Sequence, residues 1–171
     1  MQKCLTKLFQ TKTFKKTVFV LGALFLILSV GIAINPDPFL KFGYWGVFLF
    51  NLFGPGTLLI PSLSRYMNIP LLSVVTALGM LLNDSISWIV GKNGEVVLPP
   101  NKKVERVSKQ IQGFGPYALF VWSFLPIPYD FIGLIAGYLK IPYKNFAIPT
   151  FFGRLTRLLL IGYGTINIIS R

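Results

Sequence analysis

Two long apolar stretches of this chain are broken near their centres by residues that a straight helix does not accommodate. The stretch 42–64 contains Gly54-Pro55-Gly56, and the stretch 110–139 contains Pro126-Ile127-Pro128. Proline ends or kinks a helix, and the backbone groups that it frees cannot be left facing lipid. We therefore expect two re-entrant helical hairpins, at about 42–64 and 113–139, in which a half-helix descends, turns at the break and returns. A single kinked crossing is the alternative for each.

Three further segments are apolar enough to cross a bilayer, for which about 20 such residues suffice. Residues 17–34 are uncharged, residues 67–91 carry Asp84 as their one charge, and residues 145–169 carry two arginines. The first segment is interpreted as a retained transmembrane anchor, with a secretory signal peptide as the alternative. The sequence thus predicts an all-α integral membrane protein with an additional N-terminal transmembrane helix.

The chain divides into a basic N-terminus, residues 1–16, and a single membrane domain, residues 17–171. Within this domain, residues 101–112 carry apolar side chains at helical spacing among basic ones. The apolar positions are Val104, Val107 and Ile111. This pattern predicts a short amphipathic helix on the membrane surface, with a solvated connecting helix as the alternative.

The charges are sparse and one-sided. Seventeen Lys and Arg oppose five Asp and Glu, and only 13% of residues are charged while 53% are hydrophobic. Basic clusters at residues 1–16 and 92–109 favour the cytoplasmic side, so we expect a cytoplasmic N-terminus and residence in the plasma (inner) membrane. The absence of His and the single Cys4 exclude His-based nucleophilic pairs and thiolate zinc sites. We expect no enzyme activity, no cofactor, no metal and no nucleic-acid partner.

An internal repeat emerges when the sequence is shifted by 72 residues. Residues 43–56 then lie over residues 115–128, so that the two breaks coincide, and Tyr-x-x-Ile-Pro ends both repeats. The identical pairs are Gly43/Gly115, Phe48/Phe120, Ile60/Ile132, Tyr66/Tyr138, Ile69/Ile141 and Pro70/Pro142. With one full crossing between them, the two hairpins would start from opposite faces of the bilayer. Such an inverted repeat places a transport site near the midplane.

Two motifs carry a resemblance to a known family. They are Gly79-Met-Leu-Leu-Asn-Asp84-Ser-Ile-Ser-Trp88-Ile-Val-Gly91-Lys92-Asn-Gly94 and, further on, Ala136-Gly137, Phe146 and Gly153-Arg154. Over roughly residues 40–165 the chain resembles the DedA family, also called the SNARE-associated Golgi protein or VTT-domain family. The resemblance implies a polytopic membrane protein with paired re-entrant helices, and its members are associated with moving lipids across bilayers. Ser123 and Tyr129 stand where members often carry Arg beside the second break.

Ionisable side chains inside a bilayer are candidates for function. The candidates are Asp84, Asp130, Arg154 and Arg157. The two arginines share a helix face because they are three residues apart, and we expect this pair to hold a lipid phosphate by charge-assisted hydrogen bonds while an Asp exchanges protons. The alternative is that these charges only form ion pairs that lock the helices together. Asn51 and Ser123, equivalent in the repeat, are further candidates, and the hairpin tips are expected at Gly54, Pro55, Gly56, Pro126 and Pro128.

The residues and the resemblance together favour a lipid flippase or scramblase that moves phospholipid or polyprenyl-phosphate headgroups across the bilayer. A small proton- or ion-coupled secondary transporter is one alternative, and a membrane assembly factor without transport activity is the other. The expected partners are membrane lipids, and a homo-oligomer is left open.

Overall fold

The computed structural model describes residues 34–53, 56–93, 102–126 and 129–169, together with positions 20, 24, 27, 30 and 31. These residues form helices joined by turns, with no strand among them, which confirms the all-α class. The elements are α3 (Asp37–Leu40), α4 (Gly43–Phe53), η1 (Gly56–Leu58), α5 (Leu59–Leu63), α6 (Ile69–Lys92), α7 (Lys102–Phe114), α8 (Pro116–Phe124), α9 (Asp130–Tyr138) and α10 (Tyr143–Ile169). The predicted basic segment 1–16 lies outside the described residues, and the predicted anchor 17–34 is described at six positions only.

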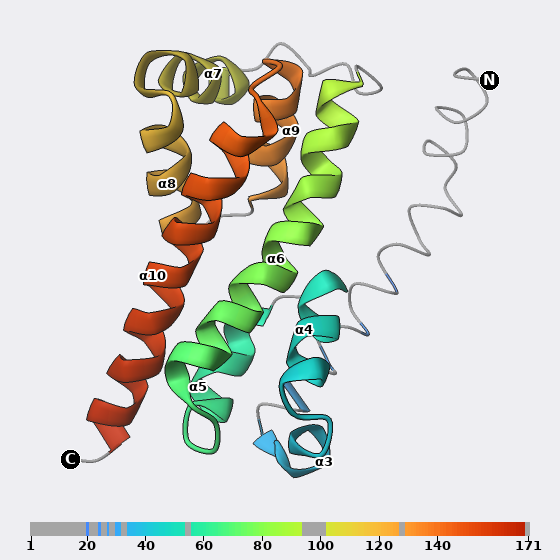
Figure 1. Ribbon diagram of the computed structural model, residues 1–171, viewed down its shortest axis with the longest axis vertical. Coiled ribbons are helices and arrows are strands. Elements are labelled where there is room, and N and C mark those ends of the chain that lie inside the picture. The colour runs from blue at the N-terminus through green and yellow to red at the C-terminus, as the bar shows by residue number, and fades with distance from the viewer. Residues whose placement is uncertain are drawn as a thin grey trace.

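Both predicted hairpins are pairs of short helices that run in opposite directions. Figure 1 shows α4 rising from the lower end of the molecule to mid-height and α5 returning to that end, while α8 and α9 make the same excursion from the upper end. A long helix follows each pair, α6 after the first and α10 after the second. The position of either pair relative to a bilayer stays a prediction.

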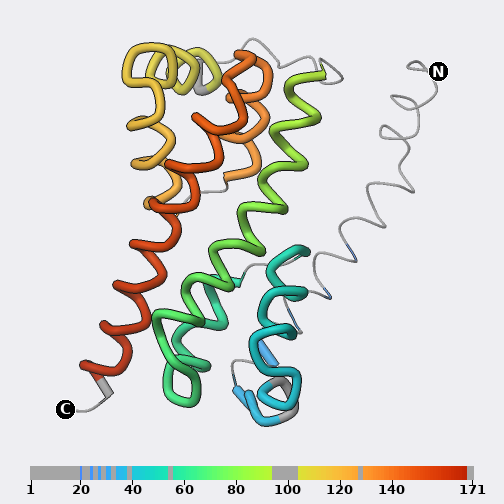
Figure 2. Tube along the Cα trace, viewed as in Figure 1, coloured from blue at the N-terminus to red at the C-terminus, as the bar shows by residue number. Residues whose placement is uncertain are grey.

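The two long helices each contact one arm of both hairpins. Helix α6 packs against α4 and α9, and α10 packs against α8 and α5. The long helices also contact each other, and Figure 2 shows that they are the two that run the height of the molecule. The first arm of each hairpin therefore lies on the long helix that follows it, and the second arm lies on the long helix of the other repeat. This exchange ties the two repeats into one bundle.

Helix α6 is the one element among the described residues whose length and composition suit a membrane crossing. It begins after Asn68, whose side chain accepts a hydrogen bond from the Leu71 amide at 3.2 Å, and Pro70 occupies its first turn. Its 24 residues span about 36 Å at 1.5 Å per residue. The local sequence therefore sets both the beginning and the reach of this helix.

Helix α7 lies across the upper end of the bundle, above α8 (Figure 1). Val107 and Ile111 are buried in the core cluster that α8 and α9 share, and Val104 packs against it. The apolar face that the periodicity predicts is thus covered by protein. On the opposite face the exposed side chains of Glu105 and Lys109 form an ion pair at 2.8 Å. A location of α7 on the membrane surface stays a prediction.

Candidate functional site

A buried ion pair joins the two long helices. Asp84 on α6 and Arg154 on α10 are only 1% and 5% exposed. Arg154 Nη2 donates a hydrogen bond to Asp84 Oδ1 at 2.7 Å and lies 2.6 Å from Oδ2. Because the same nitrogen approaches both oxygens, the pair lacks the two parallel hydrogen bonds of the strongest Arg–carboxylate pairs. Asp84 Oδ2 and Arg154 Nε have no hydrogen-bond partner. The structure therefore brings together two of the four predicted charges as a neutral pair.

Small residues let α9 approach α6 at the level of Asp84. A methyl group on Gly133 would lie 3.1 Å from the Asp84 carbonyl oxygen, and one on Gly137 would overlap the Trp88 carbonyl. These glycines are four residues apart, the spacing at which small residues line a close helix–helix contact. The same contact places the N-terminal end of α9, where Tyr129 and Asp130 lie, beside the ion pair.

Tyr129 supports Arg154 and was not among the predicted site residues. The Arg154 guanidinium lies 5.1 Å from the centre of the Tyr129 ring, within the range of a cation–π contact. The buried Tyr129 hydroxyl lies 2.7 Å from Thr150 Oγ1 and donates to the Leu119 carbonyl at 3.3 Å. An aromatic residue directly after the second break was the only signal for this role in the sequence. Through these contacts Tyr129 links the second hairpin to α10.

Arg157 links the two hairpin breaks. Its Nη2 donates to Thr57 Oγ1 at 2.9 Å, and its Nη1 donates to the Leu125 carbonyl at 2.9 Å. Thr57 lies in η1, directly after the first break, and Leu125 is the last residue before the second break. Arg157 is half-buried, its Nε has no hydrogen-bond partner, and it takes no part in either ion pair among the described residues. This guanidinium therefore keeps its positive charge between two neutral acceptors.

Asp130, the fourth charge of the predicted cluster, forms no ion pair with Arg154 or Arg157 among the described residues. It lies in the first turn of α9 and is exposed, although its charge is within electrostatic reach of Asp84. Its spacing of three and seven residues puts Asp130 on the same face of α9 as Gly133 and Gly137, but it lies at the exposed N-terminal end of the helix. Among the described residues no group of three or more His, Cys, Asp or Glu could hold a metal ion.

Asn51 and Ser123 occupy matching positions in the two repeats. Asn51 lies against Gly79 of α6 together with the Phe48 carbonyl, and Ser123 lies against Gly153 of α10 together with the Phe120 carbonyl. The pairs Phe48/Phe120 and Asn51/Ser123 are both related by the 72-residue shift. Each side chain is buried and donates to a carbonyl of its own helix, Val47 for Asn51 and Phe120 for Ser123. These two positions, 72 residues apart, thus make matching contacts where α4 packs on α6 and where α8 packs on α10.

The hairpin tips are described only in part. Gly54, Pro55 and Pro128 lie outside the described residues. Gly56 is buried directly against the Asn51 side chain, so that a larger residue there would overlap the amide, and Pro126 is exposed. Asn51 Oδ1 is buried beside Gly56 without a hydrogen-bond partner.

Comparison with known proteins places this geometry in a family. The VTT domain matches residues 46–166, well over half of the chain. An uncharacterized protein of Methanocaldococcus jannaschii is 23% identical over an alignment of 127 residues that covers 68% of this chain and 79% of the relative. No solved structure matches the chain significantly. The matched residues include most of both hairpins, all of α6, most of α10 and the charges Asp84, Arg154 and Arg157. The chain therefore belongs to the VTT-domain family, whose members are membrane-associated.

Proposed function

We propose that this protein moves lipids across a membrane as a flippase or scramblase, and that Arg157 holds the lipid phosphate on the way. The observation that carries the proposal is the position of Arg157 between the two hairpin breaks, where it donates to Thr57 and to Leu125. Among the described residues, Arg154 and Arg157 carry positive charge inside the bundle, and of these two it is Arg154 that is paired with a carboxylate. The uncompensated guanidinium is the better anion site.

The chemistry of the two arginines separates their roles. Arg154 is neutralised by Asp84 and covered by Tyr129, so recruiting it for a phosphate would first require breaking a buried ion pair. Arg157 needs to release only a hydroxyl and a backbone carbonyl. A phosphate offers two negatively charged oxygens in a geometry that matches the guanidinium fork. The incoming headgroup would replace two hydrogen bonds to neutral acceptors with two hydrogen bonds to negatively charged phosphate oxygens.

The arrangement of the hairpins supports a transport path. In the proposed topology the protein resides in the plasma (inner) membrane with its N-terminus on the cytoplasmic side. The two hairpins are re-entrant elements of an inverted repeat and start from opposite leaflets. Their breaks then meet near the midplane, where broken helices provide binding sites in transporters. The matching contacts of Asn51 and Ser123 with their long helices favour this reading of the repeat. The acyl chains would stay in lipid while the headgroup passes Arg157.

A role in membrane assembly without transport is the second candidate. It is favoured by the Asp84–Arg154 pair, which joins the two long helices and has the geometry of a purely structural lock. This candidate gives Arg157 no role beyond tying the two breaks together. It therefore predicts that charge at position 157 affects stability and leaves lipid movement untouched.

The test is lipid movement in proteoliposomes that contain a phospholipid with a fluorescent headgroup label, read by quenching of the outer leaflet. Arg157→Gln is expected to slow movement by roughly 10–100-fold, the value of a charge-assisted hydrogen-bond pair. Arg157→Lys, which keeps the charge but not the fork, is expected to fall between. Arg106→Gln, an exposed arginine of α7, is the matched control and should leave the rate unchanged. Wild-type movement in folded Arg157→Gln protein would eliminate the phosphate role.

A further inference from the structure

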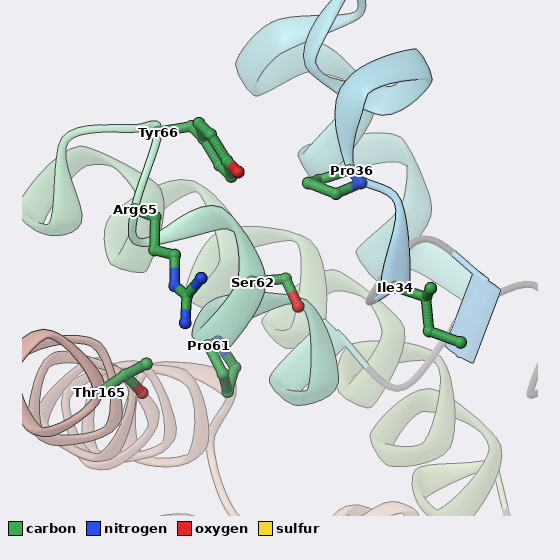
Figure 3. A pocket seen from close by; sticks show the side chains of 7 residues that line it. All are labelled: Ile34, Pro36, Pro61, Ser62, Arg65, Tyr66 and Thr165. Atoms are coloured by element: carbon green, nitrogen blue, oxygen red, sulfur yellow. The ribbon is translucent and has the colours of Figure 1, made fainter. Parts of the chain in front are cut away.

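A small pocket opens at the end of the bundle opposite α7, away from the two hairpin breaks that Arg157 links. It has a volume of about 250 Å³, and its lining comes from the segment before α3, from α5 with the turn after it, and from α10. The lining residues are Ile34, Pro36, Pro61, Ser62, Arg65, Tyr66 and Thr165. Figure 3 shows the Arg65 guanidinium extending toward the side of the pocket where Pro61, Ser62 and Thr165 lie. The pocket thus combines one cation with hydroxyls and an apolar wall.

Within the described part of the chain, the cation of this pocket has no carboxylate partner. Arg65 is its only charged lining residue, and Arg65 belongs to neither ion pair among the described residues. A guanidinium in a concave, partly apolar site recognises a phosphate through two parallel hydrogen bonds. We infer that this pocket binds the phosphate of a lipid headgroup, with Arg65 as the anion-binding residue. The inference rests on the proposed function in taking a membrane lipid as the molecule that the protein handles.

The remaining lining residues favour a lipid over free phosphate. Thr165 Oγ1 donates its proton to the Ile161 carbonyl at 2.8 Å, which leaves its lone pairs to accept from a headgroup hydroxyl or ammonium. Ile34, Pro36 and Pro61 add apolar surface that inorganic phosphate does not use. The volume is below the roughly 300–1,000 Å³ of pockets that enclose a drug-sized ligand, so it suits a headgroup whose acyl chains remain outside.

The position of the pocket relates it to the transport path. Thr165 follows Arg157 by eight residues on α10, a separation of about 12 Å along the helix axis. Helix α10 therefore connects the two places, because it carries Arg157 at the hairpin breaks and Thr165 in the pocket, while Arg65 comes from the turn after α5. The Arg65 pocket would hold the headgroup at the membrane interface before or after its passage by Arg157.

Binding to the purified full chain in detergent tests this inference by isothermal titration calorimetry. The probes are a short-chain phosphatidylglycerol and inorganic phosphate, and the background is Arg157→Gln so that the other proposed phosphate site is absent. In that background Arg65→Gln is expected to weaken phosphatidylglycerol binding by tenfold or more. Arg65→Lys is expected to lose less, because it keeps the charge. Lys41→Gln, an exposed cation outside the pocket lining, is the matched control and should bind as its parent does.

The outcomes separate the source of the phosphate and the fate of the two proposals. Arg65-dependent binding of phosphatidylglycerol with weak binding of phosphate supports a lipid headgroup, whereas equal Arg65-dependent binding of both probes overturns the lipid assignment in favour of a free-phosphate site. Equal affinities of Arg65→Gln and Lys41→Gln protein, with circular dichroism showing both folded, overturn the pocket altogether. Because the readout is binding and not movement, a failed Arg157 experiment and a failed Arg65 experiment are distinguishable.

Discussion

Removing one member of the buried ion pair should destabilise the protein far more than removing both. Asp84→Asn leaves the Arg154 guanidinium, 5% exposed, without a carboxylate. Arg154→Gln leaves a carboxylate that is 1% exposed without its cation. Asp84→Asn is expected to lower the free energy of unfolding more than Arg154→Gln does. The reason is that the guanidinium stays charged under all accessible conditions, whereas a carboxylate can bind a proton and become neutral.

The size of the effect follows from the geometry. Breaking a buried pair on one side costs about 3–5 kcal/mol. Asp84→Asn is expected at the upper end of that range, partly offset by the cation–π contact of Arg154 with Tyr129, and Arg154→Gln at the lower end. The double variant carries two neutral amides and should lose only about 1–3 kcal/mol, the cost of imperfectly satisfied buried polar groups. The two single losses together exceed the loss of the double variant, so the cycle should give a coupling free energy of about 5–7 kcal/mol in magnitude.

The assay is equilibrium unfolding of the four proteins in mixed micelles with increasing sodium dodecyl sulfate, followed by far-ultraviolet circular dichroism. The matched control is the exposed pair on α7, in which Glu105→Gln and Lys109→Gln remove the same kinds of charge at the protein surface. These control variants should not shift the global midpoint measurably. If the Asp84 and Arg154 effects simply add, or if Asp84→Asn unfolds like the control variants, the pair does not join α6 to α10 as described.

The other predictions concern close helix packing and the α7 surface. Gly137→Ala should lower the free energy of unfolding by about 1–3 kcal/mol, because the new methyl group would overlap the Trp88 carbonyl. Gly164→Ala is the control and should not lower it, because nothing lies within 4 Å of the added methyl group. Equal effects of the two variants in the same unfolding assay would contradict the close contact of α9 with α6. The hydrogen bond from Lys109 holds the pKa of Glu105 below its usual 4.5, so the pair supports α7 above that pH and its contribution is lost as pH falls through the lowered pKa. Lys109→Gln should return the Glu105 pKa toward 4.5 in a carboxyl titration by nuclear magnetic resonance, and an unchanged value would show that the pair does not form in solution.

The local sequence predicts where the helices of the fold begin and end, but it does not determine how they pack on one another. Asn68 and Pro70 begin α6, and the apolar run to Lys92 sets its length, so the sequence suffices to predict this element. The two breaks likewise predict where each hairpin turns. The spacing of its apolar residues also predicts the apolar face of α7, but this periodicity does not show what packs against that face. Only the packed structure shows that this face lies on α8 and α9 and not open to lipid.

The candidate site divides in the same way. The sequence alone determined that charges such as Asp84, Arg154 and Arg157 lie in apolar helices and need partners, because burying a lone charge is costly whatever the fold. Only the tertiary structure decided which partners they have: Asp84 takes Arg154, and Arg157 takes the two hairpin breaks. It also left Asp130 exposed. The physical reason is range, since a helix depends on neighbours a few residues away, whereas a hydrogen bond between residues 70 apart depends on how whole helices pack.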